Sequence, residues 1–367
     1  MRILFVRPRL IGDVILTTPA IRAIRRRFPD AELLYLVESL AAPVVTGNPH
    51  LTDVLIVEHR RGWDRLRDDV RMARLLRARR IDMAIDFHGG PRSAWFTWAS
   101  GAPVRVGYDI RGRMWMYTRI VRRPRHAGPR HSMLNQWDLL AAVDPALAAP
   151  PTPETDRVEM TVDPSARASV DARLAAVGMS SSDQIVVLHV SARNPFRRWP
   201  ESSFADAAAG LVRGQPRRWI VVVGGPSDRD AAGRVLAQAR ARSAAQDAAR
   251  IVPGEGWSLA EMRALMDRAA LFLGGDSGPM HIAATSDVPI VALYGPTVPA
   301  QWAPWRPPHL QTVAVDSGPL PCRPCDQRAC VPGDFRCLMR ITPESVQDAA
   351  ERVLASSRLP RMSVNAH

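Results

Sequence analysis

Short apolar runs alternate with segments of helical periodicity along most of this chain. Residues 2–6, 33–37 and 185–190 have the length and composition of buried strands, whereas the apolar side chains of residues 63–80 recur at helical spacing. Strands that alternate with helices form parallel sheets with helices on both faces. The sequence therefore predicts an α/β fold class.

A proline-rich stretch at residues 144–163 interrupts this alternation, which then resumes. Four prolines lie within it: Pro145, Pro150, Pro151 and Pro153. Such a stretch is typical of an interdomain linker, and a length of 367 residues fits two domains. We expect an N-terminal domain over residues 1–155, a C-terminal domain over 156–345 and a final helix over 343–357.

The sequence also excludes several classes of protein. Hydrophobic residues make up 46% of the chain, enough for large cores, so the chain as a whole is not disordered. The apolar runs are strand-sized and far shorter than the roughly 18 residues of a membrane span. The first residues contain no apolar region long enough for a secretory signal. The four cysteines all lie between Cys322 and Cys337, unlike a disulfide framework, so a soluble, cytoplasmic protein is expected.

In open α/β sheets, ligands bind at the carboxyl ends of the strands, so loops that follow strands are candidate sites. The first such loop, residues 7–13, ends with Asp13 near a predicted helix start. Asp13 is either an N-cap, which the spacing alone favours, or a carboxylate base that faces a cleft between the two domains. The loop lacks the G-x-G-x-x-G and G-x-x-x-x-G-K-[ST] fingerprints, which disfavours an oxidoreductase.

Three loops of the second domain combine glycines, hydroxyls and charges. Residues 189–200 contain a hydroxyl and three arginines, which suit either a phosphate cradle or an ordinary basic surface loop. Glycines and helix-start amides in residues 274–281 favour an anion such as a diphosphate, although His281 alternatively is a structural histidine. Residues 294–297 add a hydroxyl donor after another strand. The residues singled out in these loops are Ser191, Arg197, Asp276, Ser277, Gly278, His281 and Thr297.

Four motifs follow one another in a specific order. They are G-D-x-x-L-T-T-P-A at 12–20, R-R-W-P at 197–200, G-D-S-G-P-M-H at 275–281 and Y-G-P-T at 294–297. In this combination the chain resembles glycosyltransferase family 9, the ADP-heptose:lipopolysaccharide heptosyltransferases, over roughly residues 1–355. The resemblance implies a GT-B fold, in which two Rossmann-like domains face each other across a cleft. It further implies that the first domain binds the acceptor, that the second binds the nucleotide-sugar, and that the final helix packs back toward the first domain.

The resemblance also implies roles for individual residues. Asp13 matches the general base that deprotonates the acceptor hydroxyl. Arg197 stands where the family usually has a lysine that contacts phosphate, and its longer, forked side chain changes that contact. Asp228 matches an acidic position that contacts the nucleoside. The complete set of expected donor-binding residues is Ser191, Arg197, Asp228, Asp276, Ser277, Gly278, His281 and Thr297.

The implied reaction needs no metal or cofactor and inverts the anomeric centre. A heptose or related sugar would move from an ADP-sugar to a glycolipid acceptor of the lipopolysaccharide-core type. Two alternatives stay open: a transferase for another nucleotide-sugar or acceptor, and a nucleotide-sugar-binding protein without turnover. The D-x-D motif at 228–230 is typical of metal-dependent transferases, but it opens a predicted helix, where acidic residues are expected anyway.

The cysteines form a separate pattern, Cys322-x2-Cys325-x4-Cys330-x6-Cys337. This spacing is compact enough to surround a tetrahedral zinc or iron, although it fits no common zinc finger. In a reducing compartment, free or partly paired thiols that stabilise a loop are the favoured interpretation. We therefore predict no metal, with a site at the four cysteines as the less favoured alternative.

All 49 basic residues are arginine, and the net charge is +13. This excess indicates either anionic partners or a coding bias against lysine. Seven arginines lie within residues 111–130, interspersed with aromatic residues and methionines. Such a run is either a solvated basic face or a landing site for an anionic glycolipid and the inner membrane. The candidate contacts are Arg111, Arg113, Arg119 and Arg122.

Nucleic acid is the rival partner for so basic a protein. No nucleic-acid-binding module is recognised, and aromatic residues make up only 6% of the chain. The expected partners are therefore an ADP-sugar and an anionic glycolipid, with peripheral membrane contact and no nucleic acid.

Overall fold

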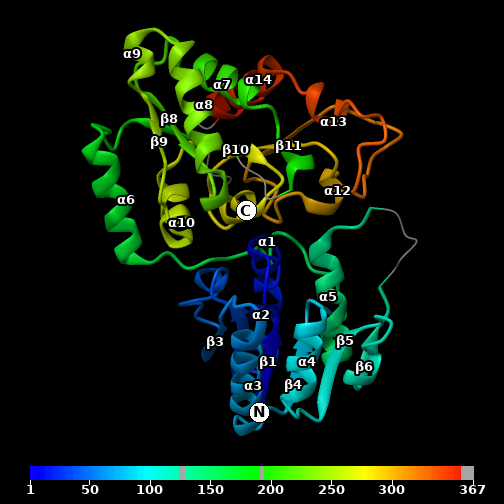
Figure 1. Ribbon diagram of the computed structural model, residues 1–367. Coiled ribbons are helices and arrows are strands. Elements are labelled where there is room, and N and C mark those ends of the chain that lie inside the picture. The colour runs from blue at the N-terminus through cyan, green and yellow to red at the C-terminus, as the bar shows by residue number, and fades with distance from the viewer. Residues whose placement is uncertain (124–128, 191–193, 357–367) are drawn as a thin grey trace, which may run out of the picture. The chain divides into compact units, whose positions relative to one another are not determined.

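The computed structural model describes residues 1–123, 129–190 and 194–356. The chain divides into two compact units (Figure 1). The first unit comprises Met1–Asp163 with Trp305–Pro307, and the second comprises Pro164–Pro304 with the chain from Pro308 onward. Each unit is built around a parallel sheet, as the alternation of strands and helices predicts.

The first unit contains a six-stranded parallel sheet with the order β3-β2-β1-β4-β5-β6, which is the strand order of a Rossmann fold. Its strands are β1 (Arg2–Val6), β2 (Glu32–Glu38), β3 (Asp53–Val57), β4 (Met83–Asp86), β5 (Val104–Tyr108) and β6 (Arg119–Val121). Its helices are α1 (Ile11–Ile15), α2 (Thr18–Arg27), α3 (Gly62–Ala78), α4 (Pro91–Ala99) and α5 (Ser132–Val143).

The second unit repeats this topology with the order β12-β11-β10-β7-β8-β9, so both Rossmann-like domains are confirmed. Its strands are β7 (Gln184–His189), β8 (Arg218–Val223), β9 (Ile251–Pro253), β10 (Leu271–Gly275), β11 (Ile290–Tyr294) and β12 (Thr312–Asp316). Its helices are α6 (Pro164–Ala176), α7 (Glu201–Val212), α8 (Arg229–Ala241), α9 (Ala245–Ala248), α10 (Leu259–Arg268), α11 (Gly278–Ala284), α12 (Pro299–Trp302), α13 (Arg336–Met339) and α14 (Pro343–Ser356).

The strand order reverses at one place in each sheet, between β1 and β4 in the first unit and between β7 and β10 in the second. In doubly wound sheets, ligands bind at this switch point, outside the carboxyl ends of the strands. The loops that follow these four strands are therefore the places where a site is expected.

The proline-rich stretch that was expected to link the domains packs on the first unit. Val158 and Met160 within it are buried. The first unit therefore extends to Asp163, beyond the expected end of the N-terminal domain. Trp305 joins the same unit, because its Nε1 donates a hydrogen bond to the Asp156 carbonyl oxygen at 2.9 Å.

The final helix, expected over residues 343–357, is α14. Its apolar side chains recur at helical spacing, and Val346, Ala350 and Val353 are buried in the core of the second unit. There α14 lies beside α7 (Figure 1). The expected return of this helix toward the first domain stays a prediction.

Candidate functional site

Asp13 lies in the short helix that follows β1. The N-cap of this helix, α1, is Leu10, so the interpretation of Asp13 as the cap is wrong. The Asp13 carboxylate instead forms an ion pair with Arg7, with 2.6 Å between Oδ2 and Nη2. The two side chains are 13% and 9% exposed, so water screens their attraction only weakly.

Arg7 also connects the loop after β1 to the loop after β4, at the switch point of the first sheet. Its Nη1 donates a hydrogen bond to the Phe87 carbonyl oxygen at 2.7 Å. His88 follows directly, and burial together with the charges of Arg7 and Arg9 lowers the pKa of His88 to about 4. His88 is therefore neutral at pH 7, and it lies close enough to the Arg7–Asp13 pair to feel its charges.

A buried carboxylate organises the loop after β4. Asp86 accepts hydrogen bonds from the backbone amides of His88 and Gly89, from Ser93 Oγ and from Tyr117 Oη, at 2.7–3.0 Å. Burial raises the pKa of Asp86, against the effect of these four donors. This hydrogen-bond network fixes the backbone conformation at His88 and Gly89.

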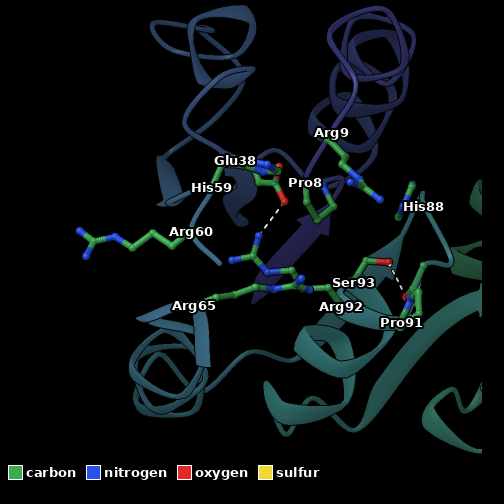
Figure 2. Close-up of a pocket in the computed structure, with 11 residues that line it drawn as sticks. Pro8, Arg9, Glu38, His59, Arg60, Arg65, His88, Pro91, Arg92 and Ser93 are labelled. Carbon is green, nitrogen blue, oxygen red and sulfur yellow. Dashed lines mark hydrogen bonds and ion pairs between the residues drawn. The ribbon is translucent and has the colours of Figure 1, made fainter. Parts of the chain in front are cut away.

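A pocket of about 220 Å³ opens beside this loop (Figure 2). Glu38, the last residue of β2, accepts a hydrogen bond from Arg92 Nη1 at 2.6 Å, and its Oε2 lies 3.1 Å from His59 Nδ1. Arg92 also donates to Asp69 at 2.6 Å. The pocket carries an excess of positive charge, because three more arginines line it: Arg9, Arg60 and Arg65.

In the second unit, an ion pair joins the segment after β7 to the loop after β10. Arg197 Nη1 lies 3.2 Å from Asp276 Oδ2, and both were expected donor-binding residues. Asp276 is 4% exposed, whereas the Arg197 side chain is 27% exposed. The Arg197 Nε donates to Gln327 Oε1 at 2.8 Å. Two partners therefore fix the guanidinium of Arg197, while part of it stays open to solvent.

Two expected donor-binding residues carry buried hydroxyls that have no partner among the described residues. Within residues 194–356, neither Ser277 Oγ nor Thr297 Oγ1 forms a hydrogen bond. Buried polar atoms are normally paired, so a polar ligand would satisfy them. Gly278 begins α11, and His281 is buried within that helix. The expected residue Ser191 lies outside the described residues.

Asp228 is buried next to the start of α8. Its carboxylate accepts hydrogen bonds from Arg198 Nη2 at 2.9 Å and from Ser227 Oγ at 3.0 Å. Asp230 lies in the first turn of α8, so the D-x-D motif does open a helix. Among the residues that the structure describes, no group of three His, Cys, Asp or Glu side chains has the arrangement of a metal site.

The four arginines that were expected to contact an acceptor or a membrane differ in their surroundings. Arg113 donates to a backbone carbonyl of the loop after β4 at 2.8 Å, and Arg119 donates to the last turn of α5 at 2.7 Å. Arg111 and Arg122 are exposed. Arg113 and Arg119 therefore support the fold, whereas Arg111, Arg119 and Arg122 are exposed and accessible to a partner. No helix in the described part of the chain is long and apolar enough to cross a membrane.

The four cysteines are half-buried, free thiols. Together they line one pocket of about 250 Å³ in the second unit. Burial raises the pKa of Cys337, which keeps this thiol protonated at neutral pH. Whether these thiols stabilise a loop or hold a metal stays a prediction.

Sequence reasoning missed four residues of the first unit: Arg7 and His88, which interact with Asp13, and Glu38 and Arg92, which line the pocket. The rule that led to Asp13 could have found three of them. Arg7 and Glu38 directly follow the strands expected at 2–6 and 33–37, and His88 lies in the loop after β4, so all three occupy carboxyl ends. Arg92 carries no such signal, because it lies in the first turn of α4 and its role depends on ion pairs with Glu38 and Asp69.

Comparisons with known proteins agree with this description of the fold. Residues 70–334 match the model of glycosyltransferase family 9 (heptosyltransferase). The chain is 26% identical over 332 residues to a lipopolysaccharide heptosyltransferase 3 of Escherichia coli, which covers 87% of this chain and 90% of that protein.

Solved structures are similar over almost the whole length. A family 9 glycosyl transferase from Veillonella parvula superposes with a TM-score of 0.82 at 23% identity and covers 97% of each chain. The E. coli heptosyltransferase WaaC, solved with ADP, superposes with a TM-score of 0.69 at 19% identity and covers 96% of this chain and 100% of its own. The fold is that of the GT-B heptosyltransferase structures. With its family model matched over most of its length, the chain belongs to glycosyltransferase family 9, the heptosyltransferase family, and is a glycosyltransferase.

Proposed function

We propose that this protein is an inverting heptosyltransferase that moves a heptose from an ADP-sugar to a glycolipid acceptor of the lipopolysaccharide-core type, with Asp13 as general base. The family and the names of its relatives support the sugar and the acceptor class. The structure of WaaC with ADP supports the nucleotide. The observation that carries the proposed role of Asp13 is its ion pair with Arg7 at the switch point of the first sheet.

Asp13 has the properties of an oriented base. Arg7 holds Oδ2 in an ion pair, while no described residue donates a hydrogen bond to Oδ1. In the proposed step, the acceptor oxygen forms a bond to the anomeric carbon as the bond from that carbon to the diphosphate breaks. The acceptor hydroxyl gives its proton to Oδ1 of Asp13, and ADP leaves with the bonding electron pair.

The second unit supplies groups that stabilise the leaving diphosphate. Arg197 offers a fixed positive charge, and the buried hydroxyls of Ser277 and Thr297 have no protein partner within residues 194–356. Such groups stabilise the charge that develops in the transition state when they are positioned in advance. Asp228, which Arg198 holds at 2.9 Å, is proposed to contact the nucleoside.

The pocket around Glu38 and Arg92 is the proposed site for an acidic group of the acceptor. Four arginines line it against one carboxylate, and Arg60 and Arg65 are about half exposed. In Figure 2, Arg60 extends away from the Glu38–Arg92 pair, and its Nε lies 3.0 Å from Asp68 Oδ2. A phosphate or carboxylate that enters this pocket gains forked hydrogen bonds from arginine.

We propose that the reaction takes place in the cytoplasm, with the protein bound peripherally to the inner face of the inner membrane. There it would bind its anionic glycolipid acceptor. The exposed Arg111 and Arg122 are proposed to contact its headgroups.

The experiment is a measurement of nucleoside diphosphate release with a panel of donors and a lipopolysaccharide-core acceptor. ADP-heptose should give the fastest acceptor-dependent release, and Asp13→Asn should abolish it while ADP binding stays within about twofold of the wild type. A preference for another donor would correct the proposed identity of the transferred sugar or of the nucleotide. Tight nucleotide binding without release for any donor would instead indicate a binding protein. If the Asp13→Asn variant turned over within tenfold of the wild type, Asp13 would not be the general base.

A further inference from the structure

The cysteine-bearing segment, residues 317–337, packs against two loops of the proposed donor site. The Cys325 backbone amide donates to the Pro296 carbonyl oxygen at 3.0 Å. Arg323, which is almost completely buried, donates to the Thr297 carbonyl oxygen at 2.7 Å. The segment therefore braces the loop after β11, which also carries the buried hydroxyl of Thr297.

Gln327 connects the same segment to the loop after β7. Its Oε1 accepts hydrogen bonds from Arg197 Nε and from Asn194 Nδ2, both at 2.8 Å. The residues lie 130 and 133 positions away in the sequence. One side-chain oxygen therefore joins the cysteine-bearing segment to both Asn194 and Arg197.

The backbone of Gln327 is held in an unusual conformation. Its φ of 59° lies in the left-handed region, which residues other than glycine adopt only when their surroundings impose it. Its amide donates to Cys325 Sγ at 3.3 Å. Cys325 thus helps to orient the Gln327 side chain toward Arg197. The spacing of the cysteines alone does not indicate this role.

We propose that Gln327 is a positioning residue for Arg197 and that the cysteine-bearing segment is thereby part of the donor site. Gln327 fixes Nε and Asp276 fixes Nη1, which leaves Nη2 as the guanidinium nitrogen without a partner among the described residues. A guanidinium that is fixed in this way loses less rotational freedom when it binds an anion. The ligand is the diphosphate of a nucleoside diphosphate, and the inference rests on the proposed function of Arg197 in donor binding.

The test compares Gln327→Met, Arg197→Ala and the double variant, with ADP as the probe. Gln327→Met keeps the length of the side chain but removes the acceptor oxygen. It should weaken ADP binding and raise the donor KM by roughly tenfold, the size expected for a hydrogen bond to a charged group, while kcat changes less than about twofold. The double variant should bind ADP no more weakly than Arg197→Ala alone, because Gln327 acts through Arg197.

Arg328→Ala is the matched control, since its side chain is 89% exposed on the same segment and should leave ADP binding unchanged. Thermal unfolding of every variant separates loss of fold from loss of positioning. If Arg197→Ala weakens ADP binding but Gln327→Met does not, or if the two effects add, the positioning role is overturned and the donor site stands. If Arg197→Ala itself binds ADP normally, both the proposed donor site and this inference are overturned.

Discussion

Arg7 and Asp13 form an ion pair, 2.6 Å between Nη2 and Oδ2, at the point where the strand order of the first sheet reverses. Both side chains are nearly buried, so each charge depends on the other. Arg7 therefore has two tasks: it pairs with the carboxylate, and through its hydrogen bond to Phe87 it fixes the carboxylate relative to the loop that carries His88.

Replacement of Arg7 by Gln should reduce both stability and transfer. A nearly buried carboxylate that loses its partner costs about 3 kcal/mol of the free energy of unfolding, and Asp13 loses the contact that orients it. We expect turnover to fall by about a hundredfold at saturating substrates, since an unanchored base is no longer held in place. Urea unfolding and steady-state kinetics on the same preparation measure the two effects.

The double variant Arg7→Gln/Asp13→Asn separates these two effects. Because it removes both charges, it should recover most of the lost stability but none of the turnover. Arg2→Gln is the matched control, since the Arg2–Glu32 pair has a similar length, 2.8 Å, but is exposed, and its loss should reduce stability far less. Equal losses of stability for Arg7→Gln and Arg2→Gln would contradict the argument.

A strand could be predicted from the sequence where its apolar residues form a continuous run. The apolar run at 2–6 coincides with β1, whereas β5 was not predicted because Arg105 and Gly107 interrupt its apolar residues. The edge strands β6, β9 and β12 are short or half-exposed, so they also lack a continuous apolar run. Chain pattern alone thus found the central strands β1, β2, β4, β7, β8, β10 and β11 and the edge strand β3, and it missed β5 and the other three edges.

The candidate site divides in the same way. Asp13 and Asp276 could be found because they follow strands, at the edge of the sheet where ligands bind. Arg197 was predicted to contact phosphate by itself, but its ion pair with Asp276 was not predicted. Gln327 could not be found, because its hydrogen bond to Arg197 spans 130 residues and depends on the path of an irregular segment.

Stability should fall as the pH is lowered from about 6.5 to 4. Burial lowers the pKa of His189 from its ordinary 6.5 to about 4. Between these pH values the unfolded chain binds a proton that the folded chain does not, so the free energy of unfolding decreases as the pH falls. The stabilising contribution of the neutral histidine is fully present above a pH of about 6.5. One fully buried histidine contributes up to about 3 kcal/mol to this decrease. His88 acts in the same direction.

Urea unfolding at pH 7 and at pH 4.5 measures this decrease. The variant His189→Gln should show a smaller difference between the two pH values than the wild type, whatever its absolute stability. His309→Gln, at an exposed position, should show the wild-type difference. An unchanged difference in His189→Gln would show that this histidine is not the group responsible.

The exposed aromatic residues near the arginine run should support contact with a membrane. The rings of Trp98 and Trp115 lie 5.8 Å apart, and 42% and 62% of the two residues are exposed. Aromatic rings insert at the lipid headgroup level, and nearby arginines attract anionic lipids. We expect binding to vesicles that contain anionic phospholipid at low salt, and release at high salt.

Trp115→Ala should weaken this binding several-fold in a vesicle sedimentation assay. The matched control is Trp63→Ala, because Trp63 is even more exposed, at 81%, but lies at the start of α3. Equal binding by all three proteins, or binding that does not respond to salt, would argue against this surface as the contact.

The pocket around Glu38 gives a prediction that separates acceptor binding from donor binding. Arg65, on α3, lines this pocket and is about half exposed, with only a 3.6 Å contact to Asp69. Arg65→Gln should therefore leave the fold intact but raise the acceptor KM by about tenfold, since one charge-assisted hydrogen bond to an acidic group is lost. The donor KM and the affinity for ADP should not change.

Arg74→Gln provides the comparison, because Arg74 is exposed on the same helix and does not line the pocket. Its acceptor KM should equal that of the wild type, so that the difference between the two variants measures the pocket rather than the net charge of the protein. An acceptor that lacks its phosphate and carboxylate groups should abolish the difference, because Arg65 then has no anion to bind. If Arg65→Gln and Arg74→Gln raise the acceptor KM equally, the attraction is a long-range effect of the arginine excess, and the pocket is not the acceptor site.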